Sequence, residues 1–166
     1  LVGSEMCIRD SSKIDLSDDY LQAIRLYASC ADELKSSELY RNDLIEFVSY
    51  YVAAKAENFY KQALKDDSEN RVLAAQRNLQ QTVDLLMDVD RLLASHPLYR
   101  LEEWVELARN SGTTLQEKDA YEANAKRLIT SWGGIQEDYA ARFWSGLIKD
   151  YYIPRIPVSY THLRAH

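Results

Sequence analysis

Glycine and proline are scarce in this sequence, which has five glycines and three prolines in 166 residues. An all-β sandwich or barrel needs many turns built from these residues, so the composition argues against both folds. Long apolar runs are also missing, and no stretch approaches the roughly 20 residues of a membrane-spanning helix. With 28% charged and 46% hydrophobic residues, the chain has the composition of a folded domain rather than of a disordered segment.

Basic charge and metal ligands are in short supply as well. The 20 Lys and Arg residues are outnumbered by 26 Asp and Glu, and the net charge of −6 argues against a nucleic-acid-binding surface. The two cysteines and three histidines form no group with the spacing of a zinc site, so we expect neither a metal nor a cofactor. The glycine-rich, P-loop, HExxH and GxSxG motifs are also absent.

The two ends of the chain show no helical or strand periodicity. The chain begins LVGSEMCIRD and ends VSYTHLRAH, and both strings resemble translated sequencing-adaptor sequence. We therefore expect residues 1–11 and 158–166 to be artefacts and residues 12–157 to be the natural part. That part contains one cysteine, Cys30, whose apolar neighbours predict a small buried residue rather than a reactive thiol.

Apolar side chains at three- and four-residue spacing predict an all-α bundle of about six helices, with no strand. Ser17, followed by two aspartates, marks the start of the first helix, which we expect to end near Lys35. The other helices are expected at about 39–65, 69–94, 98–110, 115–131 and 137–152. The second and third are long and joined by a short polar loop, so they should pack antiparallel in the centre.

Polar residues mark several helix ends. The run from Asp66 to Ser68 should end the second helix and cap the third; it lacks the glycine and closing glutamate of a calcium loop. His96, before a proline, is expected to be a loop or C-cap residue rather than a ligand. Thr114 followed three residues later by Glu117 predicts a capping box at the start of the fifth helix.

The expected core is rich in aromatic residues. On the second helix the predicted buried stripe consists of Leu44, Phe47, Val48, Tyr51, Ala54 and Phe59. The densest aromatic stretch runs from Trp132 to Arg155. Gly146, in the middle of the sixth predicted helix, costs about 1 kcal/mol relative to alanine and so should permit a close approach, most simply of another helix.

Several segments follow one another in the order of a known family. LITSWG followed by DYAARFWSGLIKDYYIPR resembles the C-terminal region of the α-N-acetylglucosaminidases, glycoside hydrolase family 89. LYRNDLIEFVSYYVAAKA, LEEWVELAR and YEANAKRLIT resemble earlier helices of the same region. The resemblance therefore extends from about Leu39 to Arg155.

This resemblance implies an enzyme with a small α/β domain, a TIM-like catalytic barrel and an all-helical C-terminal domain. Such an enzyme removes terminal α-linked N-acetylglucosamine with retention, using two barrel glutamates only ~5 Å apart. We therefore expect the chain to be a partial helical domain, inactive alone and without a catalytic residue. Its implied partners are the barrel of the same polypeptide and the terminal sugar of a glycan, with no nucleic acid or membrane. The implied location is secreted, periplasmic or lysosomal.

Two aromatic residues are implied to line the sugar pocket by their positions in the family motif. Trp132 would offer a ring face to the sugar and Tyr139 a hydrogen bond, although packing between domains is the competing interpretation for both. Asn124, Lys126 and Arg155 match family positions too, with a structural role expected. A truncated domain should also leave aromatic patches of several hundred Å² bare.

The alternative from the residues alone is a non-catalytic helical protein-interaction module. In the enzyme reading, Trp132 and Tyr139 share a concave patch beside bare apolar surface. In the module reading, both side chains are buried in a closed core.

Overall fold

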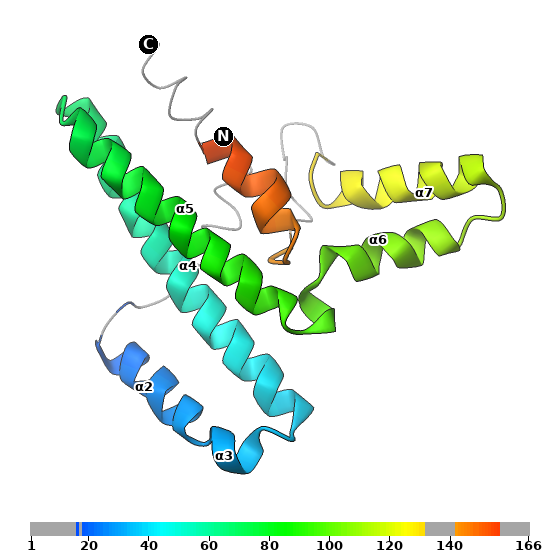
Figure 1. Cartoon of the computed structure of the whole chain (residues 1–166), viewed down its shortest axis with the longest axis horizontal. Helices are drawn as coiled ribbons and strands as arrows, with labels where there is room; N and C mark the ends of the chain where they lie inside the picture. The colour runs from blue at the N-terminus through cyan, green and yellow to red at the C-terminus, as the bar shows by residue number, and fades with distance from the viewer. Residues whose placement is uncertain (1–15, 17, 132–141, 157–166) are drawn as a thin grey trace. The chain divides into compact units, whose positions relative to one another are not determined.

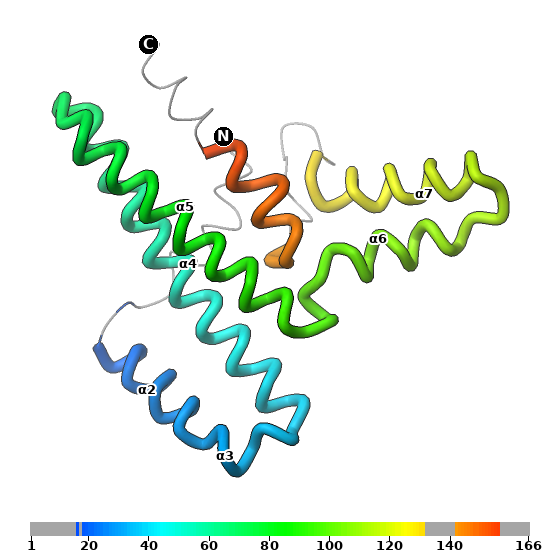
Figure 2. Tube along the Cα trace, viewed as in Figure 1, coloured from blue at the N-terminus to red at the C-terminus, as the bar shows by residue number. Residues whose placement is uncertain are grey.

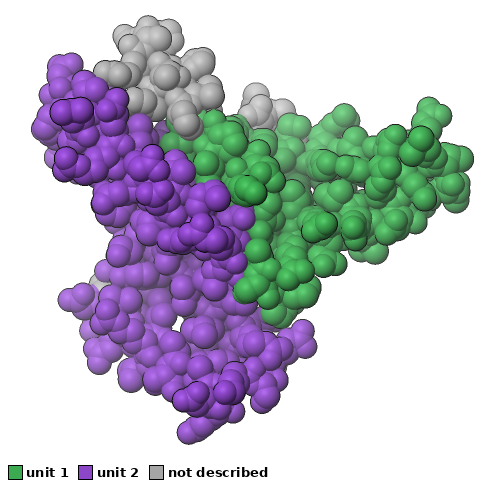
Figure 3. Space-filling view, in the orientation of Figure 1, with its two compact units in different colours: residues 1–9, 93–166 green, residues 10–92 purple. Residues whose placement is uncertain are grey.

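The computed structural model describes residue 16, residues 18–131 and residues 142–156. Residues 10–92 belong to one compact unit, unit 2, and residues from Leu93 onward belong to unit 1 (Figure 3). Within the described ranges no β-strand forms, so the all-α prediction is confirmed. No helix in these ranges is long and apolar enough to cross a bilayer.

Unit 2 contains two short helices followed by a long helical hairpin (Figure 1). The predicted pair of long antiparallel helices is confirmed, because α4 and α5 run side by side in opposite directions (Figure 2). The Thr82 hydroxyl donates to the Asn78 carbonyl of its own helix at 2.9 Å and lies 3.3 Å from the Ala56 carbonyl across this pair. The helices are α2 (Asp18–Ser29), α3 (Ala31–Leu34), α4 (Glu38–Ser68) and α5 (Val72–Ala94), whose last two residues belong to unit 1.

Small residues make up most of the buried face of α4, and Tyr40 and Ile45 are its large apolar members. Of the predicted stripe only Ala54 is buried, and Phe47 is 40% exposed, so that prediction is wrong. A helix surface of alanine and serine lets a neighbouring backbone come close, as the Thr82 contact requires. The buried small residues of the two long helices are Ser49, Ala53, Ala54, Ala56, Ala63, Ala75 and Thr82.

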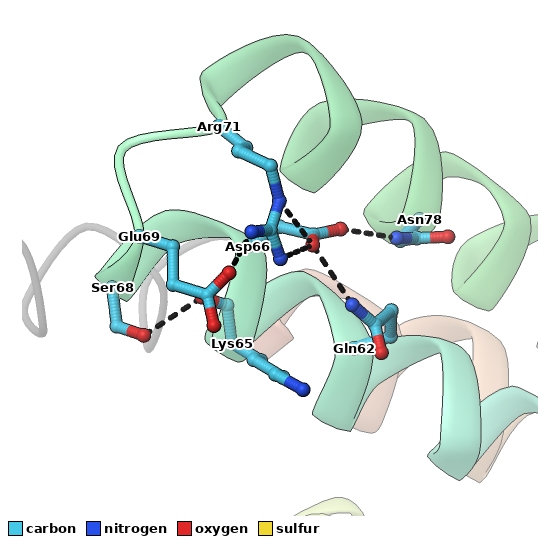
Figure 4. A network of polar contacts seen from close by, with 7 residues as sticks. All are labelled: Gln62, Lys65, Asp66, Ser68, Glu69, Arg71 and Asn78. Carbon is cyan, nitrogen blue, oxygen red and sulfur yellow. Dashed lines mark hydrogen bonds and ion pairs between the residues drawn. The ribbon is translucent and has the colours of Figure 1, made fainter.

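The turn between α4 and α5 is organised by one carboxylate (Figure 4). Asp66 lies in the last turns of α4, with its side chain only 5% exposed, and accepts from Gln62 at 2.8 Å. The Arg71 guanidinium donates to it at 2.6 and 3.0 Å, and Asn78 donates from α5 at 2.7 Å. These hydrogen bonds, those of Arg71 foremost, lower the pKa of Asp66.

This arrangement corrects the predicted ends of the long helices. The run from Asp66 to Ser68 lies within α4 rather than after it, and α5 begins later than predicted, at Val72. Asn70 makes the reversal with a φ of 59°, in the left-handed region that asparagine tolerates. Asp66 thus stabilises the turn by binding Arg71.

The first predicted helix is broken at Cys30 into α2 and α3. The Tyr40 hydroxyl donates to the carbonyls of Tyr27 at 2.8 Å and Ala28 at 3.4 Å, and so takes acceptors from the end of α2. Cys30 is exposed, so its predicted burial is wrong. The expected cap Ser17 lies outside the described residues.

Unit 1 contains η1 (Pro97–Tyr99), a 3₁₀ turn, then the hairpin of α6 (Leu101–Asn110) and α7 (Leu115–Leu128), and finally η3 (Ile148–Tyr152). The fourth helix begins later than predicted because Pro97 starts a separate turn, capped by His96, whose Nδ1 accepts from the Leu98 amide at 3.3 Å. The loop role predicted for His96 is confirmed.

The sixth predicted helix is only partly present. Residues 137–141 lie outside the described ranges, residues 142–145 are not helical, and the helix starts at Leu147. Its central part, η3, is a π-helix, and the helix continues through Pro154 instead of stopping before it. Gly146 therefore precedes the helix and does not lie in its middle.

The capping box predicted at α7 is confirmed. The Thr114 hydroxyl accepts from the Glu117 amide at 3.2 Å, and the Glu117 carboxylate accepts from the Thr114 amide at 3.1 Å. The same carboxylate accepts from the hydroxyl and amide of Thr113 at 2.6 and 2.8 Å. These hydrogen bonds lower the pKa of Glu117 from 4.5 to about 2.

Replacing Asp66 by alanine should lower the midpoint of thermal unfolding by several degrees, because Arg71 and Asn78 both lose a buried acceptor. Circular dichroism melts would measure this change. The matched control is Asp32→Ala, whose side chain is fully exposed and should melt as the unchanged chain does. Equal midpoints for the two variants would contradict this account of the turn.

The pH dependence of stability should report Glu117. A carboxyl group whose pKa is lowered by folding stabilises the fold above its ordinary pKa, and this contribution is lost as the pH falls toward the folded-state value. The loss attributable to Glu117 should therefore lie between about pH 4.5 and about pH 2. Melts of Glu117→Gln across this range should show a shallower fall than the parent chain; parallel curves would refute the assignment.

Candidate functional site

The two residues implied to bind sugar, Trp132 and Tyr139, lie outside the described residues. The structure describes the framework on either side of them: the end of α7 up to Ser131, and residues 142–156. Both parts lie in unit 1, together with the start of α6. This framework is the described part of the candidate site.

α6 and α7 form a hairpin (Figure 1). It has few buried residues and several polar contacts between its two helices. α6 has no buried residue, and α7 has only Ala125, whose carbonyl accepts from the Trp104 indole at 3.4 Å. Arg109 donates across the hairpin to Asp119 at 2.7 Å and to Glu122 at 2.8 Å. These two carboxylates raise the pKa of Arg109.

Residues 142–156 are joined to the start of α6 by a short backbone ladder. Ser145 pairs with Arg100 in an isolated parallel bridge: its amide donates to the Tyr99 carbonyl at 2.7 Å, and its carbonyl accepts from the Leu101 amide at 3.0 Å. The Trp104 and Trp144 rings lie 6.1 Å apart beside this bridge. The ladder fixes the backbone where the chain re-enters the described region.

Gly146 is required by the geometry next to that ladder. Its φ of +85° is one that residues with a side chain rarely adopt, and a Cβ there would lie 3.2 Å from the Leu101 Cβ. The predicted close approach at Gly146 is thus confirmed, with Leu101 at the N-terminus of α6 as the neighbour. The position predicted for it, in the middle of a helix, is wrong.

A second contact joins the end of α7 to η3. The Tyr151 hydroxyl donates to the Thr130 carbonyl at 3.3 Å, and the Arg155 guanidinium lies 4.5 Å from the Tyr151 ring centre, a cation–π distance. Sequence reasoning missed this pair: the partners are 21 positions apart, and a threonine carbonyl leaves no signal in a sequence.

An open cleft of about 820 Å³ lies beside these contacts in unit 1. The cleft is lined by aliphatic side chains together with acidic groups, basic groups and one phenol. Such a lining can hydrogen-bond a polar, uncharged ligand. Its walls are Ala94, Arg100, Leu101, Glu102, Val105, Lys126, Thr130, Ser145, Gly146, Leu147, Asp150 and Tyr151.

The structure describes the other three residues that match family positions. Lys126 pairs with Glu122 at 2.5 Å, Arg155 covers Tyr151, and Asn124 is exposed on α7. Within the described ranges no three His, Cys, Asp or Glu side chains come together as a metal site would require. Large apolar side chains do lie bare in unit 1, among them Leu98, Leu107 and Leu115 at 61–70% exposure.

Comparisons with known proteins agree with this framework. A family model of the alpha-N-acetylglucosaminidase (NAGLU) C-terminal domain matches residues 10–165. Human alpha-N-acetylglucosaminidase is 31% identical over 140 residues, which are 82% of this chain and 19% of the human protein.

Solved structures of a family 89 glycoside hydrolase from Clostridium perfringens are also similar. One is a complex with 2-acetamido-1,2-dideoxynojirmycin, and another is a doubly substituted variant with its substrate GlcNAc-α-1,4-galactose. Each is 27% identical to this chain, with a TM-score of 0.80, and the match covers 87% of this chain and 17% of theirs.

These matches place the chain among the helical regions of glycoside hydrolases. It belongs to the alpha-N-acetylglucosaminidase C-terminal domain family. The chain spans less than a fifth of the length of the relatives it matches. The resemblance identified from the sequence motifs is therefore confirmed, while the adaptor-like boundaries at 1–11 and 158–166 stay predictions.

Replacing Gly146 by alanine should destabilise unit 1 by about 1–2 kcal/mol, the cost of a left-handed backbone for a residue with a Cβ. The close Leu101 Cβ adds to this cost. Chemical denaturation would measure it, with Gln116→Ala on the exposed first turn of α7 as the control. An unchanged unfolding midpoint in Gly146→Ala would mean that the backbone at this position is not constrained.

Proposed function

We propose that this chain is part of a retaining glycosidase that removes terminal α-linked N-acetylglucosamine from glycoconjugates. In this proposal the helical region packs on the catalytic barrel of the same polypeptide and contributes to the rim of the sugar pocket. The catalytic glutamate pair belongs to the barrel, so the 166-residue chain alone is inactive. Membership of the family is the observation that carries the proposal.

The relatives support the substrate class. The C. perfringens enzyme was solved with GlcNAc-α-1,4-galactose, which is described as its substrate. The human relative is an alpha-N-acetylglucosaminidase by name. A chain that aligns with both over more than four-fifths of its length is most simply assigned to an enzyme acting on the same terminal sugar.

The ion-paired glutamate of the hairpin, Glu122, is poorly suited to act as a general acid. A general acid needs a raised pKa so that it still holds its proton at neutral pH. Hydrogen bonds from Lys126 and Arg109 instead lower the pKa of Glu122. Asp119 shares the same arginine. Both carboxylates are therefore suited to holding the hairpin together, and we assign them no proton transfer.

Trp132 and Tyr139 are the residues that we propose at the rim. An indole presents a flat apolar face to the C–H side of a sugar ring, and a phenol donates or accepts a hydrogen bond with its hydroxyls. Trp132 follows directly on Ser131, whose amide donates to the Arg127 carbonyl at 3.1 Å. A well-held backbone at the preceding residue suits a side chain that must meet a ligand in one orientation.

The test uses the full-length polypeptide that carries this segment, assayed for release of N-acetylglucosamine from an aryl α-glycoside. Trp132→Ala or Tyr139→Ala should lower kcat/KM by ~100-fold, about 2.7 kcal/mol of transition-state stabilisation, without changing the melting temperature. Gln116→Ala, at an exposed polar position of α7, is the control and should keep full activity.

Two other outcomes would change the assignment. An active polypeptide with mild effects of both substitutions would make the region a scaffold and remove Trp132 and Tyr139 from the rim. A folded full-length polypeptide that releases no N-acetylglucosamine would contradict the glycosidase proposal and favour a protein-interaction module.

A further inference from the structure

We infer that Tyr151 and Gly146 are positioning residues. They fix the residues on either side of segment 132–141, Thr130 and Ser145, relative to each other and to the start of α6. We call this connection the tie, and its contacts all lie within unit 1. Its consequence for sugar binding rests on the proposed function, because Trp132 and Tyr139 belong to that segment.

The first end is fixed where α7 finishes. The amides of Thr130 and Ser131 donate to the Arg127 carbonyl at 3.2 and 3.1 Å, so the backbone stays hydrogen-bonded up to Ser131. Ile129 is only 4% exposed and anchors the same turn in the interior of the protein. The Thr130 hydroxyl donates to the Lys126 carbonyl at 2.7 Å and so satisfies a carbonyl in the last turn of α7.

The second end is fixed by the ladder at Ser145. Both backbone groups of Ser145 are hydrogen-bonded to residues flanking Arg100, so this strand-like contact sets the position and direction of the chain. Gly146 then turns the chain sharply against Leu101, and Leu147 is 1% exposed. Only glycine meets both demands at that position without strain, the positive φ and the close neighbour.

Tyr151 joins the two ends to each other. It stands on η3, whose position follows from Ser145 and Gly146, and its hydroxyl reaches the Thr130 carbonyl next to the first end. The guanidinium of Arg155 lies over the ring and favours a single ring orientation. Tyr151→Phe removes this hydroxyl and keeps the ring, so it probes the hydrogen bond alone.

The tie is tested first on the 166-residue chain by amide hydrogen exchange read by mass spectrometry. Tyr151→Phe should speed exchange in peptides covering 129–131 and 142–148 by about fivefold, because one hydrogen bond between the two arms is lost. Tyr121→Phe makes the same substitution at an exposed tyrosine of α7 and should leave exchange unchanged. Equal exchange in the two variants would overturn the tie.

The consequence for function is tested on the full-length polypeptide with the aryl α-N-acetylglucosaminide. Tyr151→Phe should raise KM about fivefold with kcat within twofold, since a displaced rim weakens substrate binding more than chemistry. A residue that only stabilises the fold would lower the melting temperature and leave KM as in Tyr121→Phe, and that result would overturn the positioning role. Gly146→Ala should raise KM in the same direction.

The two tests separate the inference from the proposed function. Faster exchange in Tyr151→Phe together with full activity in Trp132→Ala would keep the tie and refute the rim. Loss of activity in Trp132→Ala together with unchanged exchange and unchanged KM in Tyr151→Phe would keep the rim and refute the tie.

Discussion

Two backbone hydrogen bonds at Ser145 are the contact on which unit 1 depends. They join residues 142–156 to the start of α6, next to a hairpin in which α6 buries no residue and α7 buries only Ala125. Directional contacts therefore specify the hairpin itself, while Ile129, Leu147 and Ile148 supply the buried apolar core of unit 1. The Ser145 ladder, the Arg109 ion pairs and the Tyr151 hydroxyl all have this directional character.

In unit 2, close packing holds the two long helices, α4 and α5, together. Alanine and serine on α4 let α5 approach until a threonine hydroxyl meets a main-chain carbonyl, and Asp66 then fixes the turn that makes the hairpin. Removing Asp66 would affect the turn, whereas enlarging a buried alanine would push the helices apart, since packed interiors tolerate little added volume. The two units thus rest on different kinds of interaction.

Local chemistry made some features predictable from the sequence, and long-range contacts made others unpredictable. The capping box of Thr114 needs only its own turn, and it was found correctly. The break at Cys30 depends on the hydroxyl of Tyr40, and the shortened last helix depends on Ser145 pairing beside Arg100. Periodicity favoured large apolar residues for the core of α4, but the close partner helix selects small ones. The proposal of Trp132 and Tyr139 as rim residues rests on motif resemblance alone, because their spacing carries no recognisable chemistry.

The π-helical character of η3 bears on how this region tolerates changes in length. A π-turn accommodates one residue more than an α-helical turn, and in proteins it is equivalent to a single inserted residue. Deleting one residue between Ile148 and Tyr152 would therefore convert this stretch into an ordinary α-helix and leave the residues after it in place. The π-turn is thus the point in this region where the loss of one residue would be absorbed rather than transmitted along the helix.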